Sequence, residues 1–230
     1  MSQSPAITEH LVQLKLELAR ICADCGRDPA SVTILAVTKT HPAEILRQAV
    51  AAGLTDIGEN RVQEAEGKFA QTGHIARFHL IGHLQSNKAK KAVRLFDVIQ
   101  SVDSPGIALE ISRRAGEVGK TIECLIEVNS SGEPQKFGVL PPEVIALAGE
   151  IGRLPNIKLT GLMTVGPLTD DPSQIRAAFR QCRELFEQMK AEISRDIAVL
   201  SMGMSGDYPI AVEEGSTMIR IGTLLFGERE

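Results

Sequence analysis

Lys39 is the residue whose chemistry stands out first in this sequence. It follows a run of β-branched and apolar residues, Val32–Thr38, and lies in the segment Ala36-Val-Thr-Lys-Thr-His-Pro42. Lysine is seldom buried without a reason, and a lysine in a low-dielectric pocket loses its proton near neutral pH. The neutral amine can then attack an aldehyde. The alternative is a lysine whose ammonium reaches solvent at the rim of the fold.

Two segments near the C-terminus have the features of an anion site. Gly222-Thr223 directly follows an apolar run that contains Arg220. Glycine lets a phosphate approach successive backbone amides, and a charge within such a run needs a partner. The segment Leu200-Ser-Met-Gly-Met-Ser-Gly-Asp207 adds glycines and the hydroxyl of Ser205. Either segment alone fits a capped turn; at the ends of adjacent strands, the two together predict a phosphate site.

These groups must be positioned by strands that alternate with helices. An opening amphipathic helix is predicted by apolar residues at steps of three and four, Ile7, Leu11, Leu14, Leu18 and Ile21. Short apolar runs then lie at about 32–38, 54–58, 77–81, 97–101, 121–128, 157–163, 197–201 and 217–221. Helical or turn-rich stretches separate them, and this alternation predicts a parallel sheet covered on both faces.

Eight strand–helix units in 230 residues fit an α/β fold, a single (β/α)8 TIM-type barrel with an extra N-terminal helix. We expect one domain over residues 1–230. A doubly wound open sheet is the alternative, although no G-x-G-x-x-G follows the first apolar run. In a barrel, active-site groups lie at the C-terminal ends of the strands and in the loops that follow. Lys39, Ser205, Gly222 and Thr223 would therefore share one mouth.

Other polar residues near these strand ends have two interpretations each. His79 and His83 have a metal-like spacing, but without a third acidic ligand nearby we expect satisfied histidines near the mouth and no metal site. Asn60 either caps the following helix or faces the mouth. Lys136 is a second amine near the same rim, or a solvent-exposed one.

Composition excludes several classes of protein. The net charge of −4 and the 3% of aromatic residues argue against a nucleic-acid-binding surface. No apolar run approaches the roughly 18 residues of a membrane span, and the N-terminus lacks the basic and apolar regions of a secretory signal.

The four cysteines, Cys22, Cys25, Cys124 and Cys182, are expected to be free thiols. We expect a cytoplasmic protein that is a monomer or a weak homodimer.

The motifs together resemble those of the pyridoxal-phosphate homeostasis proteins, the YggS/PROSC family, from about Leu11 to Gly227. The resemblance rests on six ordered blocks: Ala36-Val-Thr-Lys-Thr40, Ile57-Gly-Glu-Asn-Arg-Val-Gln-Glu64, His79-Leu-Ile-Gly-His-Leu-Gln-Ser-Asn-Lys88, Gly161-Leu-Met-Thr164, Leu200-Ser-Met-Gly-Met-Ser205 and Gly215-Ser-Thr-Met-Ile-Arg-Ile-Gly-Thr223. Two departures are Phe78, where the family commonly has Trp, and Gly206-Asp-Tyr208, where acidic or small residues are usual.

The resemblance implies a barrel like the N-terminal domain of alanine racemase, with pyridoxal 5′-phosphate (PLP) as cofactor. By this resemblance, Lys39 matches the lysine that forms a Schiff base with PLP. Arg220 matches the arginine that faces the pyridine nitrogen. The remaining matches are Ser205, Gly222 and Thr223 at the phosphate, and Asn60 and Met163 near the ring.

Two functions compete on this basis. The first is a PLP-dependent amino-acid racemase or decarboxylase, and the second is a protein of PLP (vitamin B6) homeostasis that binds PLP and supplies it to PLP-dependent apoenzymes without turnover. Racemases of this barrel type carry a further β domain that supplies a second base, whereas this sequence ends at Glu230, soon after the last strand. The sequence therefore favours the carrier. A Schiff-base aldolase would share the lysine and the phosphate site but needs an acid/base pair that is not identifiable.

Overall fold

The computed structural model describes residues 4–133 and 135–227, and these form a closed barrel with strand order β1-β2-β3-β4-β5-β6-β7-β8. The strands are β1 (Thr33–Val37), β2 (Asp56–Glu59), β3 (Arg77–Leu80), β4 (Val98–Val102), β5 (Ile122–Val128), β6 (Ile157–Thr164), β7 (Val199–Met204) and β8 (Met218–Ile221). All neighbouring pairs are parallel, and Thr33 of β1 lies opposite Met218 of β8, which closes the ring. The predicted TIM-type barrel is confirmed, and the open sheet is excluded.

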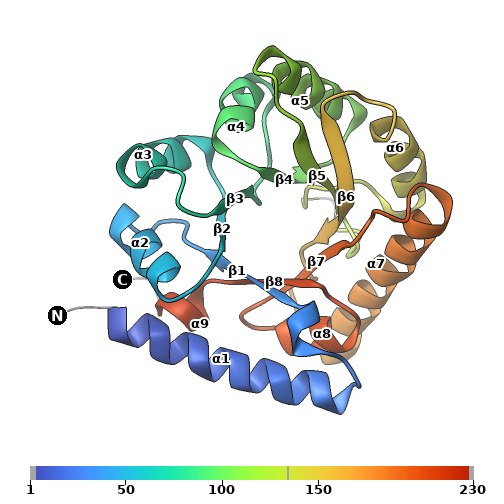
Figure 1. Ribbon diagram of the computed structural model, residues 1–230. Helices are drawn as coiled ribbons and strands as arrows, with labels where there is room; N and C mark the ends of the chain where they lie inside the picture. Colours follow the sequence, from blue (N-terminus) through green and yellow to red (C-terminus); the bar gives the residue numbers. More distant parts are fainter. Residues whose placement is uncertain (1–3, 134, 228–230) are drawn as a thin grey trace.

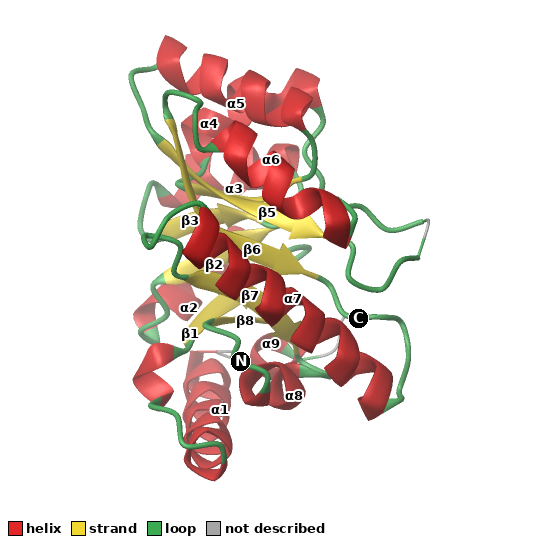
Figure 2. Cartoon of the chain, turned by 90° about the vertical axis from the view of Figure 1, so that its right-hand side faces the viewer, coloured by secondary structure: helices red, strands yellow, loops and turns green. Residues whose placement is uncertain are grey.

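Helices surround the barrel, as Figure 1 shows in a view into the ring of strands and Figure 2 from the side. The α-helices are α1 (Ser4–Asp24), α2 (Ala43–Ala51), α3 (Val62–Thr72), α4 (Ala89–Leu95), α5 (Pro105–Glu117), α6 (Val144–Ile151), α7 (Pro172–Glu192), α8 (Tyr208–Glu213) and α9 (Thr223–Phe226). Short 3₁₀ helices cover Pro29–Ser31, Ser86–Lys88 and Pro141–Glu143. The predicted N-terminal helix is α1, which lies outside the ring and contacts α2, α8 and α9.

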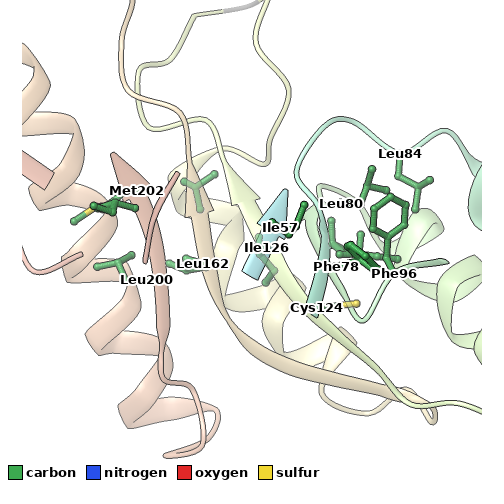
Figure 3. Packing of buried hydrophobic residues seen from close by; sticks show 14 of the residues in the cluster. Ile57, Phe78, Leu80, Leu84, Phe96, Cys124, Ile126, Leu162, Leu200 and Met202 are labelled. Carbon is green, nitrogen blue, oxygen red and sulfur yellow. The ribbon is translucent and has the colours of Figure 1, made fainter. Parts of the chain in front are cut away.

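Most of the apolar core lies between the strands and the helices. Side chains alternate along each strand, so Ile57, Phe78 and Leu80 point outward to the helices (Figure 3). Phe78 stacks on Phe69 of α3, with ring centroids 3.7 Å apart. A smaller apolar cluster lies on the opposite face of β4, β5 and β6 and consists of Val98, Leu125 and Met163. The continuous apolar runs of the sequence thus reflect strands that are covered on both faces.

Local features of the sequence mostly behave as expected. Pro42 is the N-cap residue of α2 and so lies one position before the helix. Asp207 is the N-cap residue of α8. The four cysteines are free thiols, and only Cys25 is exposed. In the part of the chain that the structure describes, none of the helices combines the length and the apolar character that a membrane span requires.

Candidate functional site at the mouth of the barrel

The predicted site residues lie in or after strands at the C-terminal end of the barrel. Lys39 follows β1, Asn60 follows β2, Met163 lies in β6, Ser205 follows β7, Arg220 lies in β8, and Gly222 and Thr223 follow β8. Because β1, β7 and β8 are neighbours, the turns that carry Lys39, Ser205 and Gly222 are adjacent. The structure therefore places these candidates at one mouth, although their individual roles stay predictions.

Arg220 is a buried cation with several fixed partners. Its NH1 donates to the carbonyl oxygen of Ser201 at 2.8 Å and to the Ser201 hydroxyl at 2.9 Å. Its NH2 donates to the carbonyl oxygen of Thr164 at 2.8 Å. Burial lowers the pKa of Arg220 to about 10, against the opposing charges of Asp207 and Glu127. The guanidinium therefore still carries its charge at neutral pH.

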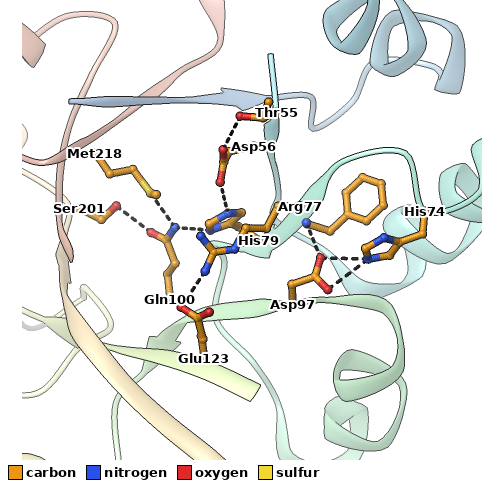
Figure 4. A network of polar contacts seen from close by, with 11 residues as sticks. Thr55, Asp56, His74, Arg77, His79, Asp97, Gln100, Glu123, Ser201 and Met218 are labelled. Atoms are coloured by element: carbon orange, nitrogen blue, oxygen red, sulfur yellow. Dashed lines mark hydrogen bonds and ion pairs between the residues drawn. The ribbon is translucent and has the colours of Figure 1, made fainter. Parts of the chain in front are cut away.

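A chain of buried polar side chains connects this arginine with the interior of the barrel. Ser201 donates to Oε1 of Gln100 at 2.7 Å, and Nε2 of Gln100 lies 2.9 Å from Nδ1 of His79. Nε2 of His79 lies 2.9 Å from Oδ1 of Asp56, the first residue of β2 (Figure 4). His79 is thus satisfied, as predicted, but it lies inside the barrel rather than near the mouth because its side chain projects inward from β3.

The loops after β7 and β8 approach each other closely. The amide of Leu224 lies 3.5 Å from the hydroxyl oxygen of Ser205. Thr223 is the first residue of α9, so its amide has no acceptor within that helix. At Gly203 the backbone has φ +95°, and an added Cβ would lie 2.6 Å from Cβ of Ala211, so this turn requires glycine. The Ser205 hydroxyl and the first amides of α9 are therefore held close together.

Lys39 lies in a tight turn directly after β1 and is half-buried. The next residue, Thr40, has φ +68°, a left-handed conformation that is unfavourable for a β-branched residue. The register between β1 and β8 places Ala36 opposite Ile221, so Gly222 lies beside Val37. An added Cβ at Gly222 would lie 3.5 Å from the carbonyl oxygen of Val37, which is ordinary van der Waals contact. The lysine turn and the Gly222 turn are thus neighbours.

Asn60 lines a cavity of about 640 Å³ beside the mouth, with Arg61 and Lys88 among the other lining residues. Its Oδ1 is buried and has no hydrogen-bond partner among the described residues. Arg61, not Asn60, is the N-cap residue of α3, so Asn60 does not cap that helix. At Gly82 an added Cβ would lie 2.4 Å from the carbonyl oxygen of Asn60, so the two loops touch through their backbones.

Met163 is fully buried and packs with Val98 and Leu125. It adjoins Thr164, whose carbonyl oxygen accepts from Arg220. Met163 is therefore one residue away from a backbone contact of Arg220 and belongs to a packed apolar cluster.

Lys136 and His83 have partners of their own at the rim. Nζ of Lys136 donates to the carbonyl oxygen of Gly166 at 2.8 Å and pairs with Glu133 at 2.6 Å. His83 lies 3.1 Å from Asp103 and stacks on Phe137, with centroids 4.0 Å apart. Over residues 4–133 and 135–227, no cluster of three or more His, Cys, Asp or Glu side chains could hold a metal ion.

Glu127 is a buried carboxyl group in β5 that the sequence did not single out. Burial raises its pKa to about 7, and the charge of Asp103 adds to this effect while Arg220 opposes it. Its Oε2 has no partner among the described residues. Glu127 lines a cavity of about 200 Å³ together with Lys136 and Phe137. The period of two along β5 places Glu127 on the same face as Leu125, a signal that an apolar-run analysis ignores.

Comparisons with known proteins agree on one family. The family described as "Alanine racemase, N-terminal domain" matches residues 13–230. The pyridoxal phosphate homeostasis protein of Aquifex aeolicus is 40% identical over 223 residues, covering 96% of this chain and 98% of that protein. The structure of PipY from Synechococcus elongatus with PLP bound is 38% identical, with a TM-score of 0.84, and covers 96% of this chain and 100% of PipY.

The relationship to alanine racemase itself is one of fold. The enzyme of Clostridium difficile superposes with a TM-score of 0.75 at 15% identity, covering 94% of this chain and 56% of the racemase chain. The much higher identity to homeostasis proteins extends over nearly the whole of both chains. This chain therefore belongs to the pyridoxal phosphate homeostasis proteins, a group within the alanine racemase N-terminal domain family.

Proposed function

We propose that this protein binds PLP at the mouth of its barrel, holds it as a Schiff base on Lys39, and supplies it to PLP-dependent apoenzymes without turning over a substrate of its own. The observation that carries the proposal is the buried cation Arg220, which lies on β8 between the Ser205 loop and the Lys39 turn. PLP has three matching groups: an aldehyde, a ring nitrogen and a phosphate.

The phosphate end is supported by the contact between the loops after β7 and β8. The Ser205 hydroxyl and the amides of Gly222 and Thr223 would donate to phosphate oxygens. Such charge-assisted hydrogen bonds contribute about 1.5–3 kcal/mol each at most. The buried charge of Arg220 adds a favourable field for an anion at the same mouth.

The ring end is supported by the unused donors of Arg220. A guanidinium has five N–H groups, and the contacts to Ser201 and Thr164 use three of those of Arg220. Among the described residues the other two have no acceptor, so they can donate to a ring nitrogen. Asn60 and Met163 would lie near the ring, and the unsatisfied Oδ1 of Asn60 fits a site that gains a donor with its ligand.

The aldehyde end needs a primary amine, which Lys39 supplies. Condensation joins Nζ of Lys39 to the aldehyde carbon and releases one molecule of water. When bound in this way, PLP can withdraw electrons from an attached amino acid. The names of the relatives, which refer to homeostasis rather than to a reaction, support a supply role instead of catalysis.

Visible absorbance tests the Schiff base. The protein incubated with PLP should be yellow, and borohydride reduction should attach the cofactor permanently to Lys39. Lys39→Ala should lose the colour while its circular dichroism stays unchanged, whereas Lys136→Ala should keep it. Undiminished colour in Lys39→Ala would refute the assignment, and loss of colour only in Lys136→Ala would transfer it to Lys136.

The phosphate placement has a separate test. Ser205→Ala should weaken PLP binding by roughly tenfold to a hundredfold, which corresponds to one charge-assisted hydrogen bond. Unphosphorylated pyridoxal should bind far more weakly than PLP to the wild-type protein and should be affected little by the substitution. Equal affinities for the two aldehydes would contradict the placement.

A PLP-dependent racemase or decarboxylase remains the second candidate, because Glu127 is a buried carboxyl group that the sequence did not single out. A buried carboxyl group with a pKa of about 7 can act as a general base. The charge of Arg220 acts on this carboxyl group, and Glu127 lines a cavity together with Lys136 and Phe137.

A further inference from the structure

Lys68 of α3 is a buried lysine whose ammonium contacts three oxygen atoms. Nζ lies 2.6 Å from the carbonyl oxygen of Thr38, 2.7 Å from Oε1 of Glu59 and 2.7 Å from Oε1 of Glu64. An ammonium group has three N–H donors, so these contacts use all of them. The side chain of Lys68 is only 7% exposed. A lysine buried this deeply and fully paired has a specific position to hold.

Lys68 and its two carboxylate partners, Glu59 and Glu64, are here called the Lys68 triad. They hold the segment around Lys39 from both sides. Oε1 of Glu59 accepts from the hydroxyl of Thr38 at 2.5 Å. Oε1 of Glu64 accepts from the backbone amide of Thr40. Thr38 and Thr40 are the two neighbours of Lys39 in the chain. The triad therefore binds the residue before the lysine and the residue after it.

These contacts fix the backbone geometry of Lys39. The carbonyl of Thr38 and the amide of Thr40 belong to the two peptide groups that meet at the α-carbon of Lys39. Each peptide group is planar, so fixing both planes fixes φ and ψ of Lys39 and the direction of its Cα–Cβ bond. Thr40 has φ +68°, which costs a β-branched residue free energy and persists only where the surroundings hold it.

The charges of Glu59, Glu64 and Lys68 strengthen the contacts that hold the Lys39 backbone. Burial would raise the pKa of Glu64, but hydrogen bonds from Lys68 and the Thr40 amide, together with the charges of Lys68 and Arg61, leave it below its usual value. Glu64 thus presents a full negative charge to the amide of Thr40. Burial raises the pKa of Glu59, against the hydrogen bonds from Lys68 and Thr38. The pairing with Lys68 offsets part of the cost of placing this carboxyl group inside the protein.

We propose that Glu59, Glu64 and Lys68 are positioning residues that hold both peptide groups around Lys39, and so direct its amine for reaction with an aldehyde. The inference rests on the proposed function of Lys39. None of the three residues needs to touch the ligand, since they act through the backbone of the reactive residue. They belong to β2 and α3, so the second strand–helix unit of the barrel positions the reactive residue of the first.

The test uses two variants and a matched control in the full-length protein. Lys68→Met removes the ammonium and keeps the length of the side chain, and Glu64→Gln removes the charge that faces Thr40. The control is Lys91→Met, which breaks an exposed ion pair of the same 2.7 Å length between Lys91 and Glu66. Circular dichroism and thermal unfolding report on folding. Amide hydrogen exchange at Thr40, measured by NMR without ligand, reports on the turn, and absorbance after mixing with PLP reports on the rate at Lys39.

Lys68→Met and Glu64→Gln should speed exchange at Thr40 and slow the reaction of Lys39 with PLP by about tenfold to a hundredfold, the cost of a misplaced reactive group. Lys91→Met should leave both unchanged. A variant that loses thermal stability but keeps wild-type exchange at Thr40 and a wild-type rate at Lys39 would overturn the proposal. If Lys68→Met fails to fold, Glu64→Gln decides, because its side chain is 25% exposed and the Lys68–Glu59 pair remains.

The two proposals fail in different ways. If wild-type protein shows no absorbance that depends on Lys39, the proposed function is wrong. The exchange of the Thr40 amide does not depend on PLP and still tests whether the Lys68 triad holds the turn. If wild-type protein reacts with PLP at Lys39 and both variants react equally fast, only the positioning role is wrong.

Discussion

Nδ1 of His79 lies 2.9 Å from Nε2 of Gln100, and this contact determines the protonation state of the histidine. Arg220 can only donate, so the hydroxyl oxygen of Ser201, 2.9 Å from NH1, accepts from it. The hydroxyl of Ser201 keeps its own proton to donate, and Oε1 of Gln100 accepts it at 2.7 Å. The amide nitrogen of Gln100 therefore faces His79, and Nδ1 of His79 is an acceptor without a proton.

The proton of the imidazole is consequently on Nε2, where it is donated to Asp56 at 2.9 Å. Burial lowers the pKa of His79, although the hydrogen bond and the charge of Asp56 oppose this effect. The hydrogen bonds run in one direction, from the cation Arg220 to the anion Asp56. Figure 4 shows the part of this chain from Ser201 to Asp56. A second proton on His79 would face the amide nitrogen of Gln100, so that amide would have to turn over to present its oxygen to Nδ1.

We expect ¹⁵N NMR of the imidazole to show a neutral His79 with its proton on Nε2 at pH 6, below the usual histidine pKa of about 6.5. As the pH falls below that value, the unfolded chain takes up this proton first, so the contribution of His79 to stability declines. Gln100→Leu would leave the Ser201 hydroxyl and Nδ1 of His79 without these partners and should cost about 2–4 kcal/mol in urea unfolding. An imidazolium spectrum at pH 6 would contradict the chain.

Glu127 should make the unliganded protein less stable as the pH rises. The unfolded chain releases this proton near pH 4.3, whereas the folded protein keeps it until about pH 7. Between these values the folded state binds more protons, so the free energy of unfolding falls with increasing pH. Glu127→Gln keeps the shape and removes the titration. Its stability relative to wild type should therefore rise by about 3 kcal/mol between pH 5 and pH 8.

Urea unfolding at several pH values measures this difference. The control is Glu123→Gln, in the same strand, where Glu123 is partly exposed and pairs with Arg77 at 2.6 Å. This control removes a charge from a partly exposed position of the same strand, and so measures the effect of charge removal alone. A difference between wild type and Glu127→Gln that stays constant with pH would mean that Glu127 ionises normally in the folded protein.

The approach of Gly82 to Asn60 predicts a localised effect of substitution. The new Cβ in Gly82→Ala would lie 2.4 Å from the carbonyl oxygen of Asn60, so one of the two loops must move. We expect a loss of stability of about 1–3 kcal/mol together with weaker PLP binding. Gly67→Ala is the matched control, because apart from its chain neighbours and the backbone of its own helix no atom lies within 4 Å of its Cβ position on α3. It should stabilise the helix by about 0.5–1 kcal/mol. Equal behaviour of the two variants would contradict the contact.

The sequence predicted the barrel well because its strands are continuous apolar runs between amphipathic helices. It predicted less about the interior, because polar residues that point inward are hidden within such runs. His79 occupies an inward position of β3, and its partner Gln100 comes from a different strand. Ser201 contacts Gln100 over a separation of 101 residues, which no local pattern reveals.

Residues at strand ends were easier to predict than the residues that hold them in position. Lys39 and Ser205 follow strands, and the topology alone places them at one mouth. Lys68 lies on a helix four residues after Glu64, a spacing typical of exposed ion pairs. Its burial depends on how α3 packs against the turn after β1, which is a property of the assembled barrel.

The rate at which the α-hydrogen of an amino acid exchanges distinguishes a PLP carrier from a PLP-dependent enzyme. Arg220 keeps its charge and can only donate, so a ring nitrogen that faces it stays unprotonated and the ring withdraws electrons less strongly. Enzymes that need strong electron withdrawal commonly place a carboxylate at that position. With alanine in heavy water, the loaded protein should therefore exchange the α-hydrogen far more slowly than about once per second, the lower range of ordinary enzymes. Faster exchange over many turnovers that disappears in Glu127→Gln would establish Glu127 as a base and favour a racemase or decarboxylase. Fast exchange that survives this substitution would also exclude the carrier and would place the base elsewhere.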